Sequence, residues 1–140
     1  MELEVQKLDP SAKLPTFAHD TDAGMDLYCL EAMTLAPSER GQVKTGIAIA
    51  IPAGYVGLIW DKSGLSHKKG IKTLGGVVDA DYRGEVFVGL VNVGTEAYTF
   101  EVGDKLAQLL VQKVEHPEIR EVTSLTETVR GANGFGSTGK

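Results

Sequence analysis

The feature that most constrains the fold is a series of short, β-branched segments, with glycine or proline between them about every ten residues. Segments of this length, separated by turn residues, are typical of the strands in an all-β barrel or sandwich. The clearest strand candidates are residues 43–51, 55–60, 86–93 and 107–114, and the weaker ones are 2–8, 25–30, 31–35, 97–102 and 118–123. Only Ser63–Lys69 has a helical pattern, with Ser63 as its expected N-cap and Gly70 after its end. The pattern therefore predicts an all-β fold with one short helix.

The length of the chain favours one domain. A chain of 140 residues can bury roughly two-thirds of the surface that it exposes when unfolded. No internal repeat of fixed period is present, and no linker divides the sequence. We expect the body of the domain in residues 1–129 and a glycine-rich C-terminal arm in residues 130–140.

The charge and the cysteine content exclude several classes of protein. Binding to nucleic acid or to an anionic membrane requires an excess of Lys and Arg, whereas this chain has a net charge of -5. We expect neither partner. An anionic small substrate would need local basic residues and a divalent cation. Cys29 is the only cysteine, so an intrachain disulfide is excluded and a reducing compartment fits best. No signal peptide and no apolar run of membrane-spanning length is present, and we therefore expect a cytoplasmic protein.

The C-terminal segment RGANGFGSTGK has the composition of a phosphate-binding loop. Its glycines match both G-x-G-x-x-G and G-x-x-x-x-G-K, but each of those motifs delivers phosphate to a helix that follows the loop. Nothing follows Lys140 in this sequence. Two interpretations are open from the residues alone: a disordered tail, or a flap that folds over a bound nucleotide.

The densest polar cluster is GGVVDADYRGE at residues 75–85, between two expected strands. It is either a solvated hairpin turn or a catalytic segment in which Asp79 activates water. In an extended chain, Asp79 and Asp81 share one face while Tyr82 lies on the other. Asp79 and Tyr82 can line one pocket only if the turn changes the direction of Tyr82.

Three other places in the sequence could carry chemistry. The segment Asp61-Lys62-Ser63-Gly64 offers amides at a helix start, a hydroxyl and a lysine, which suit either a phosphate site or an ordinary helix cap. Asp26 and Gln108 each interrupt an apolar strand candidate, as hydrogen-bonded core groups or as ligands. His19, His67 and His116 lack the spacing of a zinc site. Trp60 and Cys29 are expected in the core.

Five segments in order along residues 23–140, AGMDLY, DKSGLS, GGVVDADYRGEV, GDKLAQLL and RGANGFGSTGK, resemble the five motifs of the trimeric deoxyuridine triphosphatase (dUTPase) family. The resemblance implies a jelly-roll-type β-barrel with one short helix and a flexible glycine-rich C-terminal arm. It implies a homotrimer with active sites at the subunit interfaces. It also implies hydrolysis of dUTP to dUMP and pyrophosphate with Mg²⁺, which keeps uracil out of DNA and supplies dUMP for thymidylate synthesis.

The resemblance also implies roles for residues of the first four motifs. Asp79 would be the base that orients the attacking water, and Tyr82 would pack against the sugar. Asp26 and Gln108 would support the water shell of the metal or the α-phosphate, with no direct protein ligand to the metal. The remaining substrate-binding positions would be the uracil-reading hairpin at Thr73, Val77 and Val78, and the phosphate-binding Lys62, Ser63 and Gly64.

The fifth motif would close the site. Arg130 would pair with the γ-phosphate and Phe135 would stack on uracil. The residues that follow Phe135, namely Gly136, Ser137 and Thr138, would donate hydrogen bonds to the phosphates. The arm would thus reach the site of a neighbouring subunit.

The sequence departs from the family pattern at two positions. Lys62 stands where arginine is common, and it supplies the charge without a bidentate fork. Asn133 replaces a common glycine, and asparagine tolerates positive φ. Two alternatives remain at this stage: a dCTP deaminase of the same fold, and a non-catalytic module that binds nucleotide or protein. The complete set of Asp79, Tyr82, Arg130 and Phe135 argues against the second.

Overall fold

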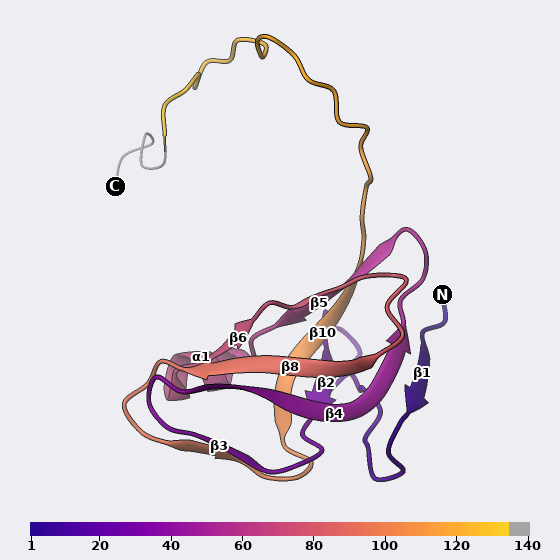
Figure 1. The fold of residues 1–140 in the computed structure, drawn as a ribbon, viewed down its shortest axis with the longest axis vertical. Coiled ribbons are helices and arrows are strands. Elements are labelled where there is room, and N and C mark those ends of the chain that lie inside the picture. Colours follow the sequence, from indigo (N-terminus) through magenta and orange to yellow (C-terminus); the bar gives the residue numbers. More distant parts are fainter. Residues whose placement is uncertain (135–140) are drawn as a thin grey trace.

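Two four-stranded antiparallel sheets form the body of the protein. The computed structural model describes residues 1–134. One sheet has the order β1-β4-β8-β6 and the other β2-β10-β5-β7, while β3 and β9 form a separate pair. Figure 1 shows β4 and β8 side by side across one face, with β5 and β10 on the other side of the barrel. The strands are β1 Glu4–Lys7, β2 Met25–Tyr28, β3 Met33–Leu35, β4 Arg40–Ala50, β5 Tyr55–Trp60, β6 Ile71–Leu74, β7 Val77–Val78, β8 Glu85–Asn92, β9 Tyr98–Phe100 and β10 Lys105–Lys113.

One apolar core lies between the sheets. Side chains on a strand alternate between its two faces, so β8 buries every second residue from Val86 to Asn92. The largest fully buried side chains include Phe100, Leu27 and Leu106. Cys29 is 3% exposed, as expected from the sequence, and burial is the main reason that the pKa of its thiol is raised. The arrangement confirms the predicted all-β, jelly-roll-type barrel.

β4 has a bulge in its pairing with β8. The pairing of β4 with β8 is interrupted between Lys44 and Ala48, where Gly46 has a positive φ of 69°. Two groups fasten this bulge to β8: the Thr45 hydroxyl donates to the Val86 carbonyl at 2.5 Å, and the Glu85 carboxylate accepts from the Gly46 N–H at 2.9 Å. A bulge of this kind bends a strand and increases its twist.

The helix α1 spans Ser63–Lys69, as the sequence predicts, and Gly70 ends it with a left-handed φ of 70°. The expected N-cap is wrong by one residue. Lys62 occupies the N-cap position with extended backbone angles, and no side chain caps the helix. A lysine offers no acceptor for the first N–H groups. Among the described residues, no helix is long and apolar enough to cross a membrane.

Two short strands that the strand patterns missed, β6 and β7, join the two sheets. We call this segment the β6–β7 hairpin, although its two strands pair with different sheets. β6 pairs with β8 in one sheet, and β7 pairs with β5 in the other. The chain changes sheets at Gly75 and Gly76, which have φ values of 68° and 112°. The two strands have only four and two residues, too few for a clear alternation of polar and apolar side chains.

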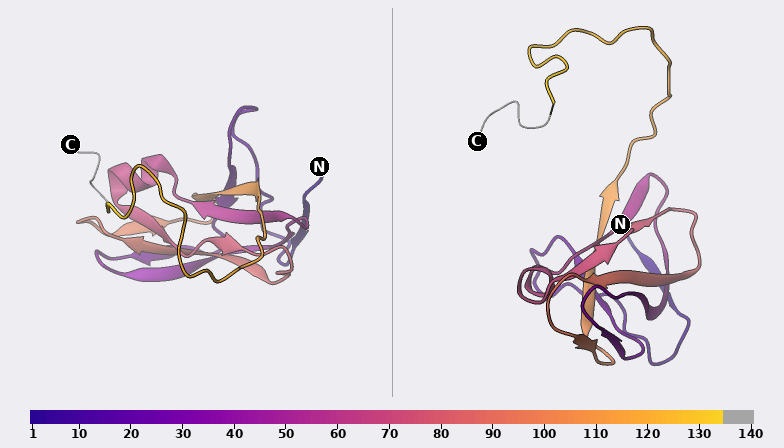
Figure 2. Two further views of the ribbon diagram at one scale, coloured as in Figure 1. Left: turned by 90° about the horizontal axis from the view of Figure 1, so that it is seen from above. Right: turned by 60° about the vertical axis from the view of Figure 1, so that its left-hand side comes forward.

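The chain leaves the barrel after β10. Figures 1 and 2 show the following segment, up to residue 134, running away from the sheets. It has no regular secondary structure, so the strand predicted at residues 118–123 is wrong. Ile119 and Leu125 are 89% and 85% exposed. The β-branched composition of this segment is not sufficient for a strand, because within the described structure it has no neighbouring strand to pair with.

Candidate active site

Asp79 and Tyr82 line one open cavity of about 260 Å³ at the end of the β6–β7 hairpin. A turn brings them together, because the Tyr82 N–H donates to the Asp79 carbonyl at 3.2 Å. The Tyr82 hydroxyl donates to the Glu85 carbonyl at 2.8 Å, and its ring packs closely against Gly84. The turn therefore changes the direction of Tyr82, as a shared pocket requires. The full lining consists of Gln42, Ile59, Gly76, Val77, Val78, Asp79, Tyr82, Glu85, Val86 and Phe87.

The hairpin presents its backbone along this cavity. Val77 and Val78 line it, and the Ile59 N–H donates to the Gly76 carbonyl at 2.7 Å. Gly76 approaches β5 so closely that a methyl group there would lie 2.6 Å from the Ile59 carbonyl oxygen. Thr73 lies elsewhere: it lines a neighbouring groove of about 260 Å³ between the hairpin and β5. The structure thus divides the hairpin residues between two adjacent hollows.

A second group gathers around the buried carboxylate of Asp26, which is 2% exposed. Lys62 forms an ion pair with its Oδ1 atom, and Lys105 Nζ lies 2.6 Å from its Oδ2 atom. The second contact is ionic and lacks the geometry of a directional hydrogen bond. Burial acts to raise the pKa of Asp26, but the two lysines outweigh it, so the pKa is lowered. Asp26 is ionised at neutral pH and fixes the ammonium group of Lys62.

Gln108 belongs to the same group. It lies opposite Asp26 in the β10–β2 register and opposite Trp60 in the β10–β5 register. Its Nε2 donates to the Asp61 carbonyl at 2.9 Å. A methyl group on Gly24 would lie 2.6 Å from Gln108 Oε1, so only glycine leaves room for this amide. The structure brings together residues of the first, second and fourth motifs.

Ser63 and Gly64 form the exposed beginning of α1, directly after Lys62. No side chain caps the helix, and no atom lies within 4 Å of a methyl group placed on Gly64. The N–H groups of the first turn of a helix have no partner within the helix. An anion near Lys62 can therefore receive hydrogen bonds from this turn.

The two groups lie apart on one chain. Val78, beside Asp79, is paired with Gly57, and Lys62 follows Gly57 by five residues. Lys62 lies two residues beyond the end of β5 and does not line the cavity that Asp79 lines. In this chain the Asp79 cavity and the group around Lys62 are therefore separate.

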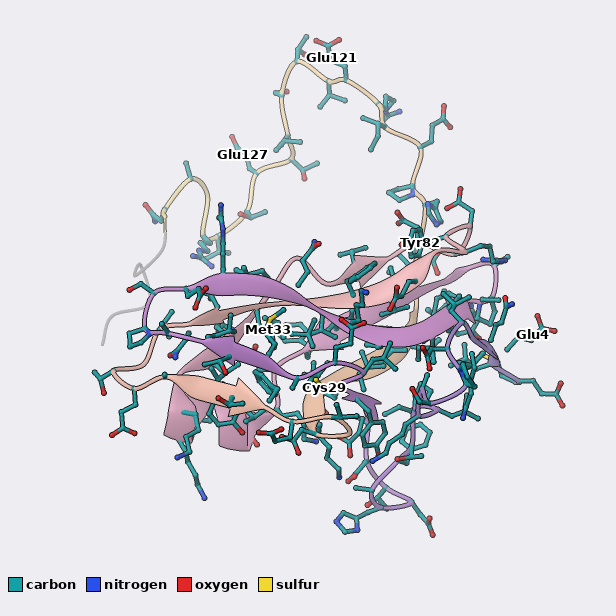
Figure 3. All side chains as sticks on the ribbon, turned by 60° about the horizontal axis from the view of Figure 1, so that its bottom comes forward. Glu4, Cys29, Met33, Tyr82, Glu121 and Glu127 are labelled. Carbon is teal, nitrogen blue, oxygen red and sulfur yellow. The ribbon has the colours of Figure 1, made fainter. Side chains whose placement is uncertain are left out.

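The part of the fifth motif that the structure describes lies on the exposed arm. Arg130 donates from Nε to the Asn133 carbonyl at 3.2 Å and from Nη2 to the Gly134 carbonyl at 3.3 Å. Figure 3 shows Glu121 and Glu127 on the segment that leads to this arm, away from the barrel that holds Tyr82. Phe135, Gly136, Ser137 and Thr138, which the sequence also assigns to the site, lie outside the described residues.

The structure corrects the expected position of Trp60 and adds residues to which the sequence assigned no role in the site. Trp60 was expected in the core but is 54% exposed, because it is the last residue of β5 and its side chain leaves the barrel. Gln42 lines the Asp79 cavity, and no sequence signal marks it. Lys105 and Asp61 lie within segments that matched the family, but their contacts depend on the fold. No group of three or more His, Cys, Asp or Glu residues within residues 1–134 is placed to hold a metal ion.

Comparison with known proteins gives one consistent family. A sequence model of the dUTPase family matches residues 10–139. The chain is 50% identical to the deoxyuridine 5'-triphosphate nucleotidohydrolase of Mycolicibacterium gilvum, over 98% of this chain and 94% of that protein. It is similar to the Staphylococcus bacteriophage 80alpha dUTPase with dUpNHpp, at 30% identity, a TM-score of 0.94 and 99% coverage of both chains.

A second solved structure adds a metal to the comparison. It is a mutant dUTPase from phage phi11 of S. aureus, described with a structural Mg(II) ion, at 31% identity and a TM-score of 0.83. The match covers 89% of this chain and 98% of that one. The motif order, the barrel, the Asp79 cavity and these similarities agree, and the chain belongs to the dUTPase family.

Proposed function

We infer that this protein hydrolyses dUTP to dUMP and pyrophosphate. The observation that carries the inference is the cavity in which Asp79, Tyr82 and the backbone of Val77 and Val78 meet. In such a cavity the exposed backbone can bind the base and the aromatic ring can pack against the sugar. The carboxylate can then orient a water molecule towards the α-phosphorus. Family membership supports the same reaction. The other two candidates, a dCTP deaminase and a non-catalytic binding module, are not favoured.

In the proposed mechanism Asp79 orients and deprotonates the attacking water. Asp79 is exposed on the cavity wall, where it can accept a proton from water. Tyr82 is held by the Glu85 carbonyl and packs against the deoxyribose. The main chain at Val77 and Val78, with Thr73 farther back on the hairpin, positions uracil. Base specificity then depends on the placement of the backbone.

Lys62, the first turn of α1 and the arm would neutralise the phosphates. Asp26, which is also paired with Lys105, positions the Lys62 ammonium group, and Ser63 and Gly64 follow Lys62 in the chain. Gln108 would contact the α-phosphate or the water shell of the metal. In the assembled site, Arg130 would pair with the γ-phosphate, Phe135 would stack on uracil, and Gly136, Ser137 and Thr138 would donate to the phosphates. Preorganised donors of this kind stabilise the charge that develops in phosphoryl transfer.

We propose Mg²⁺ as the divalent cation. Mg²⁺ binds substrate phosphates and retains several waters, so it does not require a dedicated protein cage. The described residues fit this mode. The Asp26 carboxylate is already paired with two lysines and the Gln108 amide already donates to a carbonyl, so neither side chain is free to bind the ion directly. These two residues would contact the ion only through water. When bound, Mg²⁺ supplies neutralisation of the triphosphate charge. A cytoplasmic location, where dUTP is available, is part of the proposal.

We propose that the active sites form between subunits of a homotrimer. The separation of the Asp79 group from the Lys62 group supports a site shared by two copies. Four large apolar side chains around the hairpin also remain exposed, as a surface covered by another copy would require: Trp60, Leu74, Val77 and Phe87.

A pyrophosphate-release assay tests the reaction. With dUTP, dCTP, dTTP and UTP, each with and without Mg²⁺, we expect release from dUTP alone and only with the metal. Asp79→Asn should retain binding of a non-hydrolysable dUTP analogue and lower turnover by at least ~10²-fold. Asp81→Asn, at the exposed neighbouring carboxylate, is the matched control and should remain active. Near-native turnover of Asp79→Asn would remove this residue from the mechanism.

Mixing two inactive variants tests the shared site. Asp79→Asn and Lys62→Ala would be co-expressed in equal amounts and purified together, without separating mixed oligomers from the parent ones. If a site takes residue 79 from one copy and residue 62 from another, about a quarter of the sites are intact. Activity near that fraction is expected. Activity no greater than that of the parent variants would contradict the shared site.

A further inference from the structure

Asp61 occupies the junction between the two groups of site residues, and no motif role accounts for it. Its side chain is 16% exposed, and it lies between the last residue of β5 and the N-cap of α1. Its Oδ1 atom accepts hydrogen bonds from the Thr73 N–H at 2.7 Å and from the Thr73 hydroxyl at 2.8 Å. Its Oδ2 atom forms an ion pair with Lys72.

The backbone of the same residue reaches the other group. The Asp61 carbonyl accepts from Gln108 Nε2 at 2.9 Å, and Lys62 follows directly in the chain. One residue therefore contacts the uracil-reading hairpin through its carboxylate and the phosphate-binding group through its carbonyl.

The position of the hairpin requires such a contact. β6 is an edge strand of one sheet and β5 belongs to the other, so no ladder of backbone hydrogen bonds joins them. Edge strands carry unpaired N–H groups. The Asp61 carboxylate satisfies the Thr73 N–H and crosses from one sheet to the other. At the far end of the hairpin the Ile59 N–H holds the Gly76 carbonyl. The β7 part of the hairpin is thus held to β5 by strand pairing and by the Ile59–Gly76 hydrogen bond, whereas the β6 part is held to the other sheet through Asp61.

We propose that Asp61 is a positioning residue for base recognition, holding the β6 part of the β6–β7 hairpin in place at the end of β5. The proposal rests on the proposed hydrolysis of dUTP. A hairpin that reads uracil through its main chain has no flexible side chain to compensate for a displaced backbone. Misplacement by about 1 Å can lower a rate by up to 10²-fold. Loss of the carboxylate should therefore weaken dUTP binding and discrimination between bases, with a smaller effect on the chemical step.

Steady-state kinetics of four variants test the proposal. Asp61→Ala removes both hydrogen bonds to Thr73, and we expect KM for dUTP to rise at least ~10-fold, kcat to change less than ~3-fold and the preference for dUTP over dCTP to fall ~10-fold. Asp61→Asn keeps an oxygen acceptor for both Thr73 donors and should restore KM to within ~3-fold of the wild type. Thr73→Val removes the hydroxyl alone and should raise KM by ~3-fold. Lys72→Met removes the half-exposed ion pair and should leave kinetics unchanged.

The outcomes are distinguishable. If the wild type does not hydrolyse dUTP, the proposed function fails. If it does, and Asp61→Ala retains the wild-type KM and base preference, the role of Asp61 is refuted. A lowered melting temperature with unchanged discrimination would likewise refute it, because that result indicates a structural role only. If Asp61→Ala does not fold, Asp61→Ser, which has a shorter side chain and no carboxylate, decides: a raised KM with unchanged kcat supports the proposal, and an unchanged KM overturns it.

Discussion

Replacing Gly76 by alanine should destabilise the protein far more than the same change at its neighbour Gly75. The two glycines have positive φ values of 112° and 68°, so alanine is strained at both. A methyl group on Gly75 meets open space, whereas one on Gly76 would lie 2.6 Å from the Ile59 carbonyl oxygen. The pair of variants therefore separates backbone strain from a steric collision with β5.

The magnitudes follow from the geometry. A positive φ costs a non-glycine residue about 1–2 kcal/mol, and the stiffer unfolded chain returns about 0.4–1 kcal/mol. Gly75→Ala should therefore lower the free energy of unfolding by about 1 kcal/mol. At Gly76 the methyl must move by about 0.8 Å to reach an ordinary contact distance. That shift would stretch the 2.7 Å hydrogen bond from Ile59 to Gly76, worth about 1 kcal/mol. The φ of Gly76 is also less accessible to alanine than that of Gly75. We therefore expect Gly76→Ala to lower the free energy of unfolding by about 3–4 kcal/mol.

Urea unfolding of both variants measures the difference. Protein concentration must be held constant, because the stability of an oligomer depends on it. Gly76 also lines the Asp79 cavity, so its variant should show a raised KM for dUTP, whereas the Gly75 variant should show a smaller rise. Equal losses of stability in the two variants would refute the close approach of the hairpin to β5.

Three further predictions concern other parts of the molecule. Asn92→Ala should lower the free energy of unfolding by about 2–4 kcal/mol in urea unfolding, because the fully buried amide donates to the carbonyls of Leu35 and Glu96; an unaffected midpoint would contradict this. Because the pKa of Asp26 is lowered by folding, its contribution is complete above about pH 4 and is lost as the pH falls through the folded-state value. Asp26→Asn should therefore be less stable than the wild type at pH 7 by about 1–3 kcal/mol, and unfolding at pH 3 should show a smaller difference, whereas a constant difference would contradict the ion pairs. Removal of residues 130–140 should leave the melting temperature unchanged and nearly abolish dUTP turnover; full activity would remove the arm from the mechanism.

Local signals in the sequence predicted the elements that depend on local structure. The helix Ser63–Lys69 and its end at Gly70 follow from a short helical pattern and a residue that adopts positive φ readily. The long strands β4, β5, β8 and β10 follow from runs of β-branched residues. Residues 118–123 carry the same kind of signal but form no strand. A strand requires a partner in space, and composition contains no information about that partner.

The sequence named candidate site residues but could not give their arrangement. The motif resemblance pointed to Asp26, Lys62 and Gln108, and the fold brings them together. The contacts of Lys105 with Asp26 and of Asp61 with Thr73 join segments that are distant in the sequence. Spacing along the chain cannot reveal them, because they result from strand register and from the change of sheet at the hairpin.

The misplacement of Trp60 has a different cause, and it bears on the assembly. Large apolar side chains are buried in most domains because leaving them in water is unfavourable, so a core position was the natural prediction. In the structure Trp60 and Val77 are 54% and 68% exposed, and both border the groove beside the hairpin. Complete burial of a large apolar side chain is worth about 1.5–3 kcal/mol, and a single chain forgoes part of that at each of these two residues. The proposed homotrimer would recover it by covering this surface with a second copy. The same contact would bring another chain's residues towards the Asp79 cavity, whose lining includes Val77. In the proposed trimer, the exposed tryptophan and the divided site would then be two consequences of one interface.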